Sequence, residues 1–158
     1  MVRKQTLSNL VNKLKNKVIP DVLANEVYQT VVDVESKNVQ KTVYNAYSPL
    51  VYKRRGENGG LADPKNHVAT FSYAGNMVTM AVRNTTKGQD GFGYLSGLIE
   101  YGHDAGYGQY DYPYSSVQVP TFLAPRPFIS STKAELERTL AHLTAMKAGM
   151  RNRGIKVK

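Results

Sequence analysis

Two runs of alternating apolar and polar residues, joined by a short glycine-containing turn, constrain the fold more than any other part of the sequence. Every second residue of each run is apolar: Ala69, Phe71 and Tyr73 in the first run, and Val78, Met80 and Val82 in the second. Residues 74–76, Ala-Gly-Asn, separate the two runs. Alternation on both sides of a tight turn is typical of a β-hairpin. The sequence therefore predicts an antiparallel hairpin at this place.

Helical periodicity precedes the hairpin. A first apolar stripe, with steps of three or four residues, consists of Leu7, Leu10, Val11, Leu14 and Val18. It predicts a short amphipathic helix, which Pro20 is expected to end or kink. A second, longer helix is predicted from Pro20 to a stop at Ser48-Pro49, because proline is tolerated in a first helical turn. Its stripe slips between Val34 and Val39, which indicates a bend or a shift of face near residues 36–38.

A further amphipathic helix is predicted near the C-terminus. Thr132 and Glu135 have the spacing of a capping box, and the apolar stripe after them consists of Leu136, Leu140, Leu143 and Met146. This helix is expected to end near Gly149, and residues 117–123 are predicted to form one more strand. Together the patterns predict an α+β fold, with N-terminal helices and a C-terminal helix packed on a small antiparallel sheet.

Positive charge is concentrated at the two ends of the chain. A length of 158 residues predicts a single domain, residues 1–158, and the formal net charge is +9. Residues 1–17 and residues 147–158 each carry five Lys or Arg and no acid, so these ends account for the whole excess. Such basic ends can face a polyanion or an acidic protein surface, or they can serve solubility alone. The candidate DNA-facing residues are Lys13, Lys15, Lys17, Arg151 and Arg153.

Composition excludes several classes of protein. The chain has no cysteine, which excludes a disulfide framework, a thiolate nucleophile and cysteine-ligated zinc or iron–sulfur sites. No run approaches the roughly 20 apolar residues that a membrane-spanning helix needs, so no membrane partner is expected. The basic start, residues 1–4, is not followed by the apolar stretch of a cleaved signal peptide. An intracellular or particle-borne protein is therefore expected.

Glycine and tyrosine are concentrated in one region. Residues 88–108 hold seven of the 13 glycines, and residues 94–114 hold six of the 11 tyrosines. A short apolar helix or strand near residues 95–101 leads into a long Gly/Tyr loop, residues 102–116. Loops of this length are usually functional or disordered, and tyrosine offers a large contact area at low entropic cost. The loop is expected either to make subunit contacts or to cover the core of its own monomer.

The sequence contains no arrangement typical of catalysis. The best metal-like group is Glu100, His103, Asp104 and Asp111, for which a solvated loop is the alternative. The glycine-rich stretches lack the Lys and the helix start of a phosphate-binding loop. No Ser-His-acid order can be drawn. The sequence therefore predicts no enzyme, no catalytic residue, no bound metal and no cofactor.

Two segments in the second half resemble a family of phage proteins. Residues 97–103 read Gly-Leu-Ile-Glu-Tyr-Gly-His, and residues 124–129 read Ala-Pro-Arg-Pro-Phe-Ile and lead into the C-terminal helix. With Ser48-Pro49 and Gly59-Gly60-Leu61 between the first helices and the hairpin, this order resembles the tail-completion or head–tail joining family of long-tailed bacteriophages. The resemblance covers most of the chain in the order of its elements.

The resemblance implies a structural role in the neck of the virion, with assembly in the host cytoplasm. Copies of such a protein form a ring between connector or adaptor proteins and the tail tube or tail terminator, and the ring lines the passage of double-stranded DNA. Six copies would match a tail tube, and twelve would match a connector. A cyclic ring needs a heterologous interface, in which two different surfaces meet. The candidate interface residues are Tyr52, Arg54, Arg55, Leu61, Tyr101, Tyr107, Tyr110, Tyr112, Tyr114 and Arg126.

Two other functions compete with this interpretation. One is a sequence-independent nucleic-acid-binding protein that uses its basic ends, and residues 53–55, Lys-Arg-Arg, could also contact phosphates or form a solvated rim. The other is a metal-dependent hydrolase that uses Glu100, His103 and Asp104.

The segment before the C-terminal helix has a physical role of its own. Pro125 and Pro127 hold it extended. Phe128 is therefore expected to anchor the segment in the core, and Arg126 is expected to cap a helix end or to pair with Glu100.

Overall fold

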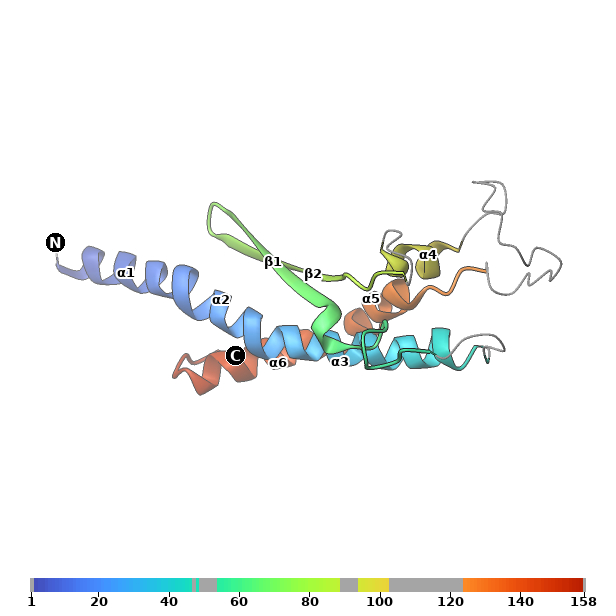
Figure 1. The fold of residues 1–158 in the computed structure, drawn as a ribbon. Coiled ribbons are helices and arrows are strands. Elements are labelled where there is room, and N and C mark those ends of the chain that lie inside the picture. Colours follow the sequence, from blue (N-terminus) through green and yellow to red (C-terminus); the bar gives the residue numbers. More distant parts are fainter. Residues whose placement is uncertain (1, 47, 49–53, 89–93, 103–123, 158) are drawn as a thin grey trace.

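A single helical rod runs from Val2 to Tyr44 (Figure 1). The computed structural model describes residues 2–46, 48, 54–88, 94–102 and 124–157. The rod consists of α1 (Val2–Lys13), η1 (Leu14–Val18), α2 (Ile19–Val22), η2 (Leu23–Val27), α3 (Tyr28–Asn38) and η3 (Val39–Tyr44), of which η1, η2 and η3 are π-helical. At about 1.5 Å per residue, the rod is on the order of 60 Å long.

Pro20 lies inside this rod, so the two helices predicted from the sequence are one. The backbone stays helical on both sides, with φ −71° and ψ −49° at Val18 and φ −62° and ψ −44° at Leu23. Directly before the proline, the amide of Ile19 donates to the carbonyl of Leu14, five residues back. This wider π turn lies directly before Pro20, which has no backbone N–H to donate, and the helix continues on the other side of the proline. The rod ends at Tyr44, before the predicted stop at Ser48-Pro49.

The π turns also keep the buried face of the rod in register. Val22 and Val27 are both buried although they are five residues apart, and η2 lies between them. A π turn takes up more residues than an α turn, so a five-residue step returns to the same face. Val34 and Val39 are also both buried and five residues apart, but the amide of Val39 donates to the carbonyl of Glu35, four residues back, so this step is α-helical. The π turn η3 begins only at Val39, after the predicted slip.

The predicted hairpin is confirmed. β1 (His67–Ala74) and β2 (Met77–Asn84) pair antiparallel, with His67 opposite Asn84 at one end and Ala74 opposite Met77 at the other. Gly75 has φ +53°, which is the left-handed conformation that a tight two-residue turn requires at its first position. The short 3-10 turn η4 (Pro64–Asn66) precedes β1, and the hairpin rises from the rod at an angle (Figure 1). The α+β fold class is therefore confirmed.

The C-terminal region contains two helices where the sequence predicts one. After α4 (Leu95–Tyr101), the chain forms α5 (Phe128–Thr139) and α6 (Ala141–Asn152). Leu140 separates them with a left-handed φ of +53°, and α6 ends three residues beyond the predicted end. The predicted strand at 117–123 and most of the Gly/Tyr loop lie outside the described residues.

The predicted capping box is wrong. Because α5 begins at Phe128, Thr132 already lies inside the helix, and its hydroxyl donates to the carbonyl of Phe128 at 2.7 Å. Glu135 instead accepts a hydrogen bond of 2.9 Å from the side-chain amide of Asn38 on the rod. The free backbone amides at the N-terminus of α5 donate instead to a residue far away in the sequence, which is described below.

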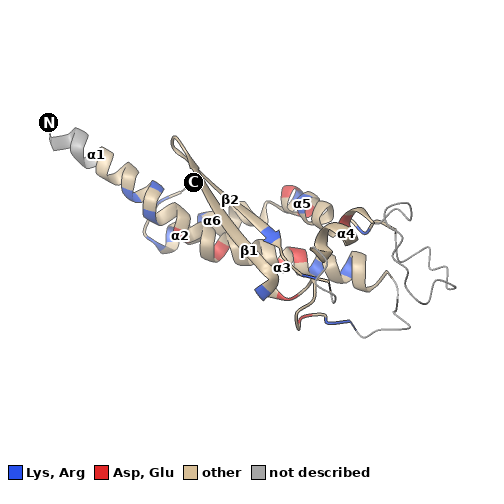
Figure 2. Cartoon of the chain, turned by 45° about the horizontal axis from the view of Figure 1, so that its top comes forward, with Lys and Arg blue, Asp and Glu red and all other residues tan. Residues whose placement is uncertain are grey.

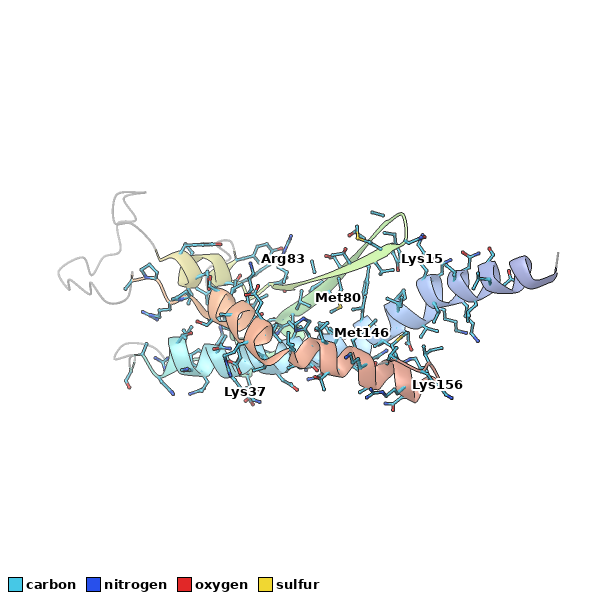
Figure 3. All side chains as sticks on the ribbon, turned by 180° about the vertical axis from the view of Figure 1, so that it is seen from behind. Lys15, Lys37, Met80, Arg83, Met146 and Lys156 are labelled. Atoms are coloured by element: carbon cyan, nitrogen blue, oxygen red, sulfur yellow. The ribbon has the colours of Figure 1, made fainter. Side chains whose placement is uncertain are left out.

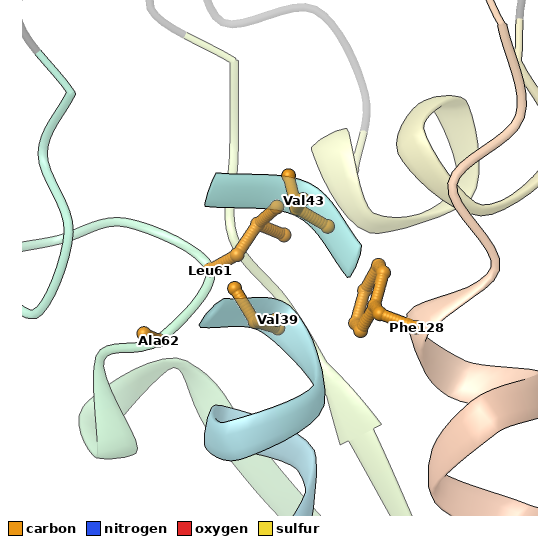
Figure 4. Close-up of a cluster of buried hydrophobic side chains, with 5 residues drawn as sticks. All are labelled: Val39, Val43, Leu61, Ala62 and Phe128. Carbon is orange, nitrogen blue, oxygen red and sulfur yellow. The ribbon is translucent and has the colours of Figure 1, made fainter. Parts of the chain in front are cut away.

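Two buried apolar clusters hold the rod against the C-terminal helices. The first consists of Val39, Val43, Leu61, Ala62 and Phe128 (Figure 4). The second consists of Val18, Val22, Val27 and Met150. The hairpin contributes Met80 to the second cluster, where Met146 of α6 also packs (Figure 3). The hairpin is thus fixed on one face by the rod and α6.

Gly149 marks a close approach between α6 and the rod. A Cβ atom at this position would lie 2.6 Å from Cγ1 of Val22 and 3.0 Å from the carboxyl carbon of Glu26. We expect Gly149→Ala to lower the free energy of unfolding by about 1–3 kcal/mol, because the helices must move apart. Urea denaturation of the variant measures this change.

Gly97 in α4 provides the matched control. A Cβ there would meet nothing within 4 Å. Gly97→Ala is therefore expected to be neutral or to stabilise by about 0.4–1 kcal/mol. Equal effects of the two substitutions would contradict the close helix crossing at Gly149.

Candidate functional site

The basic residues of the two chain ends gather in one part of the molecule, which we call the basic pole. The C-terminal tail turns back, so that Ile155 and Val157 pack against the apolar cluster around Val18 and Val22. The exposed basic residues on the elements that meet at this cluster are Lys13 and Lys17 on the rod, Lys147 and Arg151 on α6, and Lys156 in the tail. Figure 2 shows Lys and Arg in blue along α1 and α2. Three of the five candidate DNA-facing residues, Lys13, Lys17 and Arg151, thus have exposed side chains at this pole.

Arg153 fastens the tail to the rod. Its Nε lies 2.6 Å from a carboxylate oxygen of Asp21, and one of its terminal nitrogens lies 2.7 Å from Oε1 of Glu26. The hydrogen bond from Arg153 lowers the pKa of Glu26, against the effect of burial. The same bond raises the pKa of Arg153. Arg153 was predicted to face DNA, but in the structure its charge is engaged by two acids of its own chain.

Lys15 also has a partner within the chain. Its Nζ donates to the carbonyl of Gly75 in the turn of the hairpin. Lys15 therefore links the rod to the tip of the hairpin, and its role as a DNA-facing residue stays a prediction.

The candidate interface residues that the structure describes lie toward the other end of the rod. The guanidinium of Arg54 lies 5.3 Å from the centroid of the Tyr44 ring and donates to the Tyr44 carbonyl. Arg55 donates to the carbonyl of Lys87 at 2.5 Å. Both arginines therefore hold the loop after the rod, although the side chain of Arg55 is also exposed.

The remaining interface candidates differ in exposure. Tyr101 is 79% exposed, whereas Leu61 and Arg126 are buried, with 3% and 6% exposed. Leu61 belongs to the first apolar cluster, so the structure gives it a role in the core. Tyr52, Tyr107, Tyr110, Tyr112 and Tyr114 lie outside the described residues.

Glu100 caps the N-terminus of α5. Its Oε2 accepts a hydrogen bond from the amide of Ile129 at 2.7 Å, and its Oε1 accepts one from the amide of Ser130 at 2.9 Å. Next to it, the amide of Arg126 donates to the carbonyl of Ile99 at 2.8 Å. The negative carboxylate lies at the positive end of the helix and satisfies amides that have no partner within it. The two segments that carry the phage resemblance thus form one structural unit.

The cap can be tested by substitution. We expect Glu100→Gln to lower the free energy of unfolding by about 1–3 kcal/mol, because the amide loses the charge and can accept with only one oxygen. Glu137→Gln is the control, since Glu137 lies on α5 with a 67% exposed side chain 4.0 Å from Lys133. The thermal unfolding midpoints of both variants are compared with that of the wild type. Equal midpoints for all three proteins would contradict the role of Glu100 as a helix cap.

A buried polar cluster, which the sequence did not reveal, joins the rod to the base of the hairpin. Nε2 of His67 lies 3.1 Å from Oε1 of Glu35, and Nδ1 lies 3.0 Å from the carbonyl of Asp63. The side-chain amide of Asn84 donates to the same Glu35 oxygen and to the carbonyl of Leu61, each at 2.9 Å. Glu35, His67 and Asn84 are 3–5% exposed. These residues are 17–49 positions apart in the sequence, so no local pattern links them.

The protonation of His67 follows from its partners. A carbonyl and a carboxylate oxygen are both acceptors, so each ring nitrogen satisfies its partner by carrying a proton. Burial lowers the pKa of His67, but the hydrogen bond and the charge of Glu35, with the backbone hydrogen bonds at Asp63 and Pro64, outweigh burial, so the pKa is raised above its ordinary value. The raised pKa and the two acceptors both favour the charged ring, which forms a buried ion pair with Glu35.

The metal-like group predicted around residue 100 is not assembled among the described residues. Glu100 is engaged as a helix cap, and His103, Asp104 and Asp111 lie outside the described part. Within that part, no three His, Cys, Asp or Glu side chains are placed to hold a metal ion. No helix in the described ranges is long and apolar enough to span a membrane.

Comparison with known proteins identifies one family. A family model described as YomN matches residues 6–152 of the chain. No curated protein and no solved structure matches it.

Proposed function

We propose a role in the virion, and the premise is that this chain belongs to the YomN family. The family is phage-associated, so the chain is a phage protein. In this proposal the protein is a structural component of the neck. Copies form a ring between the connector or adaptor proteins and the tail tube or tail terminator, around the path of the DNA. Six copies are proposed, and twelve are the alternative.

The unit formed by residues 97–102 and 124–130 carries this proposal. These segments bear the resemblance to head–tail joining proteins, and they are held together by the Glu100 cap and by the bond from Arg126 to Ile99. Within this unit, Tyr101 is 79% exposed. A rigid unit that presents an exposed tyrosine is suited to protein–protein contact.

The first turns of the rod support an assembled form as well. Leu7, Leu10 and Val11 are 63%, 47% and 43% exposed, and the N-terminal part of the rod extends beyond the other elements (Figure 1). The same apolar stripe continues into the buried residues Val18 and Val22. An apolar stripe that is covered in one half and open in the other is typical of a protein that packs against partners.

Deletion of the gene in its phage tests the neck role. We expect host cells to accumulate complete tails and DNA-filled heads that do not join, and we expect the wild-type gene supplied in trans to restore infectious particles. Electron microscopy of lysates measures the outcome. Joined particles in normal yield from the deletion phage would contradict the proposal.

A nucleic-acid-binding function is the second candidate, and the basic pole favours it. The pole carries five exposed Lys and Arg residues, and a polyanion is attracted to such a surface irrespective of sequence. In a neck ring, the same surface would face the passing DNA.

Charge removal at the pole tests the nucleic-acid-binding function. If the pole binds DNA, we expect Lys17→Ala with Arg151→Ala to lower the slope of log affinity against log salt by about one for each phosphate that the variant no longer neutralises. Lys133→Ala on α5 is the control, because its side chain is 77% exposed and lies away from the pole. Weak binding that these substitutions leave unchanged would contradict the nucleic-acid function.

A further inference from the structure

The hairpin leaves both of its edges open among the residues that the structure describes. The sheet has two strands, and in the described ranges no third strand pairs with either of them. In a two-residue hairpin, the pair that closes the turn is hydrogen-bonded across the ladder, and every second pair after it is as well. The register then directs the backbone groups of the other pairs outward, which beyond the basal pair of His67 and Asn84 are those of Ala69, Phe71 and Tyr73 on β1 and of Val78, Met80 and Val82 on β2. At the basal pair, the carbonyl of His67 already accepts from the hydroxyl of Tyr28.

From Val68 to Val82 these edges lack the features that protect open strands in monomeric proteins, and the exposed Arg83 lies beyond this stretch, near the base of β2. Such features are short strands, bulges, prolines and charged side chains. Both strands have eight residues, and their register contains no bulge. The 15 residues from Val68 to Val82 contain no proline and no Lys, Arg, Asp or Glu. A long, uncharged edge pairs readily with another strand, and a two-stranded hairpin alone is only marginally stable.

Charge indicates which partner fits. The chain has a net charge of +9, so two copies repel each other over most of their surfaces. The hairpin is neutral from Val68 to Val82, and an anionic partner would be drawn to the basic pole instead. Val68, Tyr73 and Met77 on the hairpin are 45%, 54% and 67% exposed, and neighbouring strands would cover part of this apolar surface. The hairpin strands from Val68 to Val82 therefore add no like charge of their own to a contact with a second copy.

We propose that copies of this chain associate through their hairpins, with the β2 edge of one copy paired to the β1 edge of the next. When all hairpins point the same way, the strands that meet run in opposite directions, so the joint sheet is antiparallel throughout. The two edges are different surfaces, so the contact is heterologous and can repeat around a closed ring. The inference rests on the ring proposed above and names the contact that holds it together.

Cysteine cross-linking tests the pairing directly, because the natural chain has no cysteine. Ser72 on β1 and Thr79 on β2 are exposed and lie opposite each other in the hairpin. Ser72→Cys and Thr79→Cys are placed in separate chains, mixed, and treated with a short thiol cross-linker that tolerates a small shift in register. We expect cross-linked dimers in the mixture and few in either variant alone. Dimers formed by Ser72→Cys alone, or none in the mixture, would overturn the proposal.

Charges placed on the edge provide a second test. Thr70→Lys with Ser72→Lys adds two charges to β1, and Ala134→Lys with Asn152→Lys adds the same charge at exposed helical positions. Light scattering should give the control the wild-type oligomer mass and should give the edge variant a smaller mass. Circular dichroism checks that both variants keep their helices. Equal oligomer masses for the two variants would overturn the edge contact, and the neck ring would then be held by other surfaces.

Hydrogen exchange distinguishes an edge that pairs with a second copy from an edge that pairs with a strand of its own chain. The outward amides, such as those of Phe71 and Met80, should exchange rapidly in dilute monomer and slowly in the oligomer. Protection already present in the monomer would overturn the proposal, since a segment such as 117–123 would then occupy an edge. A wild-type chain that is monomeric at every concentration would overturn it as well, whereas the neck role is decided independently by the deletion phage.

Discussion

Replacement of Phe128 by alanine is expected to lower the free energy of unfolding by about 3–5 kcal/mol. Phe128 is completely buried, at 0% exposure. Its ring packs with Val39 and Val43 of the rod and with Leu61 and Ala62 of the loop before the hairpin (Figure 4). Because this side chain joins three separate parts of the chain, a cavity at its position cannot be closed by a local shift. Urea denaturation of the full chain measures the loss.

Phe128→Leu is the companion variant. It keeps the position apolar and most of the volume, so we expect a smaller loss than with alanine. A loss under about 1 kcal/mol for Phe128→Ala would show that Phe128 is not an anchor of the core.

The second large effect is expected for Glu35→Gln. Removal of one partner from a buried ion pair leaves the other charge uncompensated, which typically costs about 3–5 kcal/mol. In this chain the uncompensated group is His67, whose side chain is 0% exposed. The oxygen of Glu35 that contacts His67 also accepts from Asn84, so the base of the hairpin should loosen in the variant. Hydrogen exchange at the amides of His67 and Asn84 locates the effect.

The pair also predicts how stability depends on pH. The pKa of His67 is raised in the folded chain, so its stabilising contribution is fully present below the unfolded pKa of about 6.5. This contribution is lost as pH rises through the higher folded pKa. Asp63 acts in a different window: amide hydrogen bonds lower its pKa, so its contribution is lost only in acid, as pH falls through that lowered value.

Glu35→Gln should change the pH dependence as well as the stability. Without the carboxylate, burial is the main influence on the His67 ring, so its pKa should fall. NMR titration of the His67 ring measures this pKa in both proteins, and Glu137→Gln is the matched control. An unchanged His67 pKa in Glu35→Gln would contradict the buried ion pair.

The elements that the sequence predicted well are those with local signals. The hairpin follows from alternation and from a glycine at a turn position, and both lie within 18 residues. The rod was predicted as helix, but its continuity through Pro20 depends on a π turn, and no side-chain period specifies where a π turn forms. The break at Leu140 was missed for a related reason, since leucine carries no signal for a left-handed conformation.

The contacts of the candidate site residues were harder to predict, because their partners lie far away in the sequence. Glu100 was singled out, yet its role as a cap depends on amides 29 and 30 residues later. Arg153 was counted with the DNA-facing charges, but its contact with Asp21 spans 132 residues. Composition gives the sign of a charged end, whereas the fold decides which of its charges are engaged.

Labelling of intact phage tests the central claim most directly. A tagged copy of the protein, incorporated into infectious particles, is located with a gold-labelled antibody by electron microscopy and counted by quantitative mass spectrometry against the connector. We predict label at the junction of head and tail, with six copies per particle or twelve as the alternative. Label elsewhere on the particle, or purified infectious particles without the protein, would contradict a structural role in the neck.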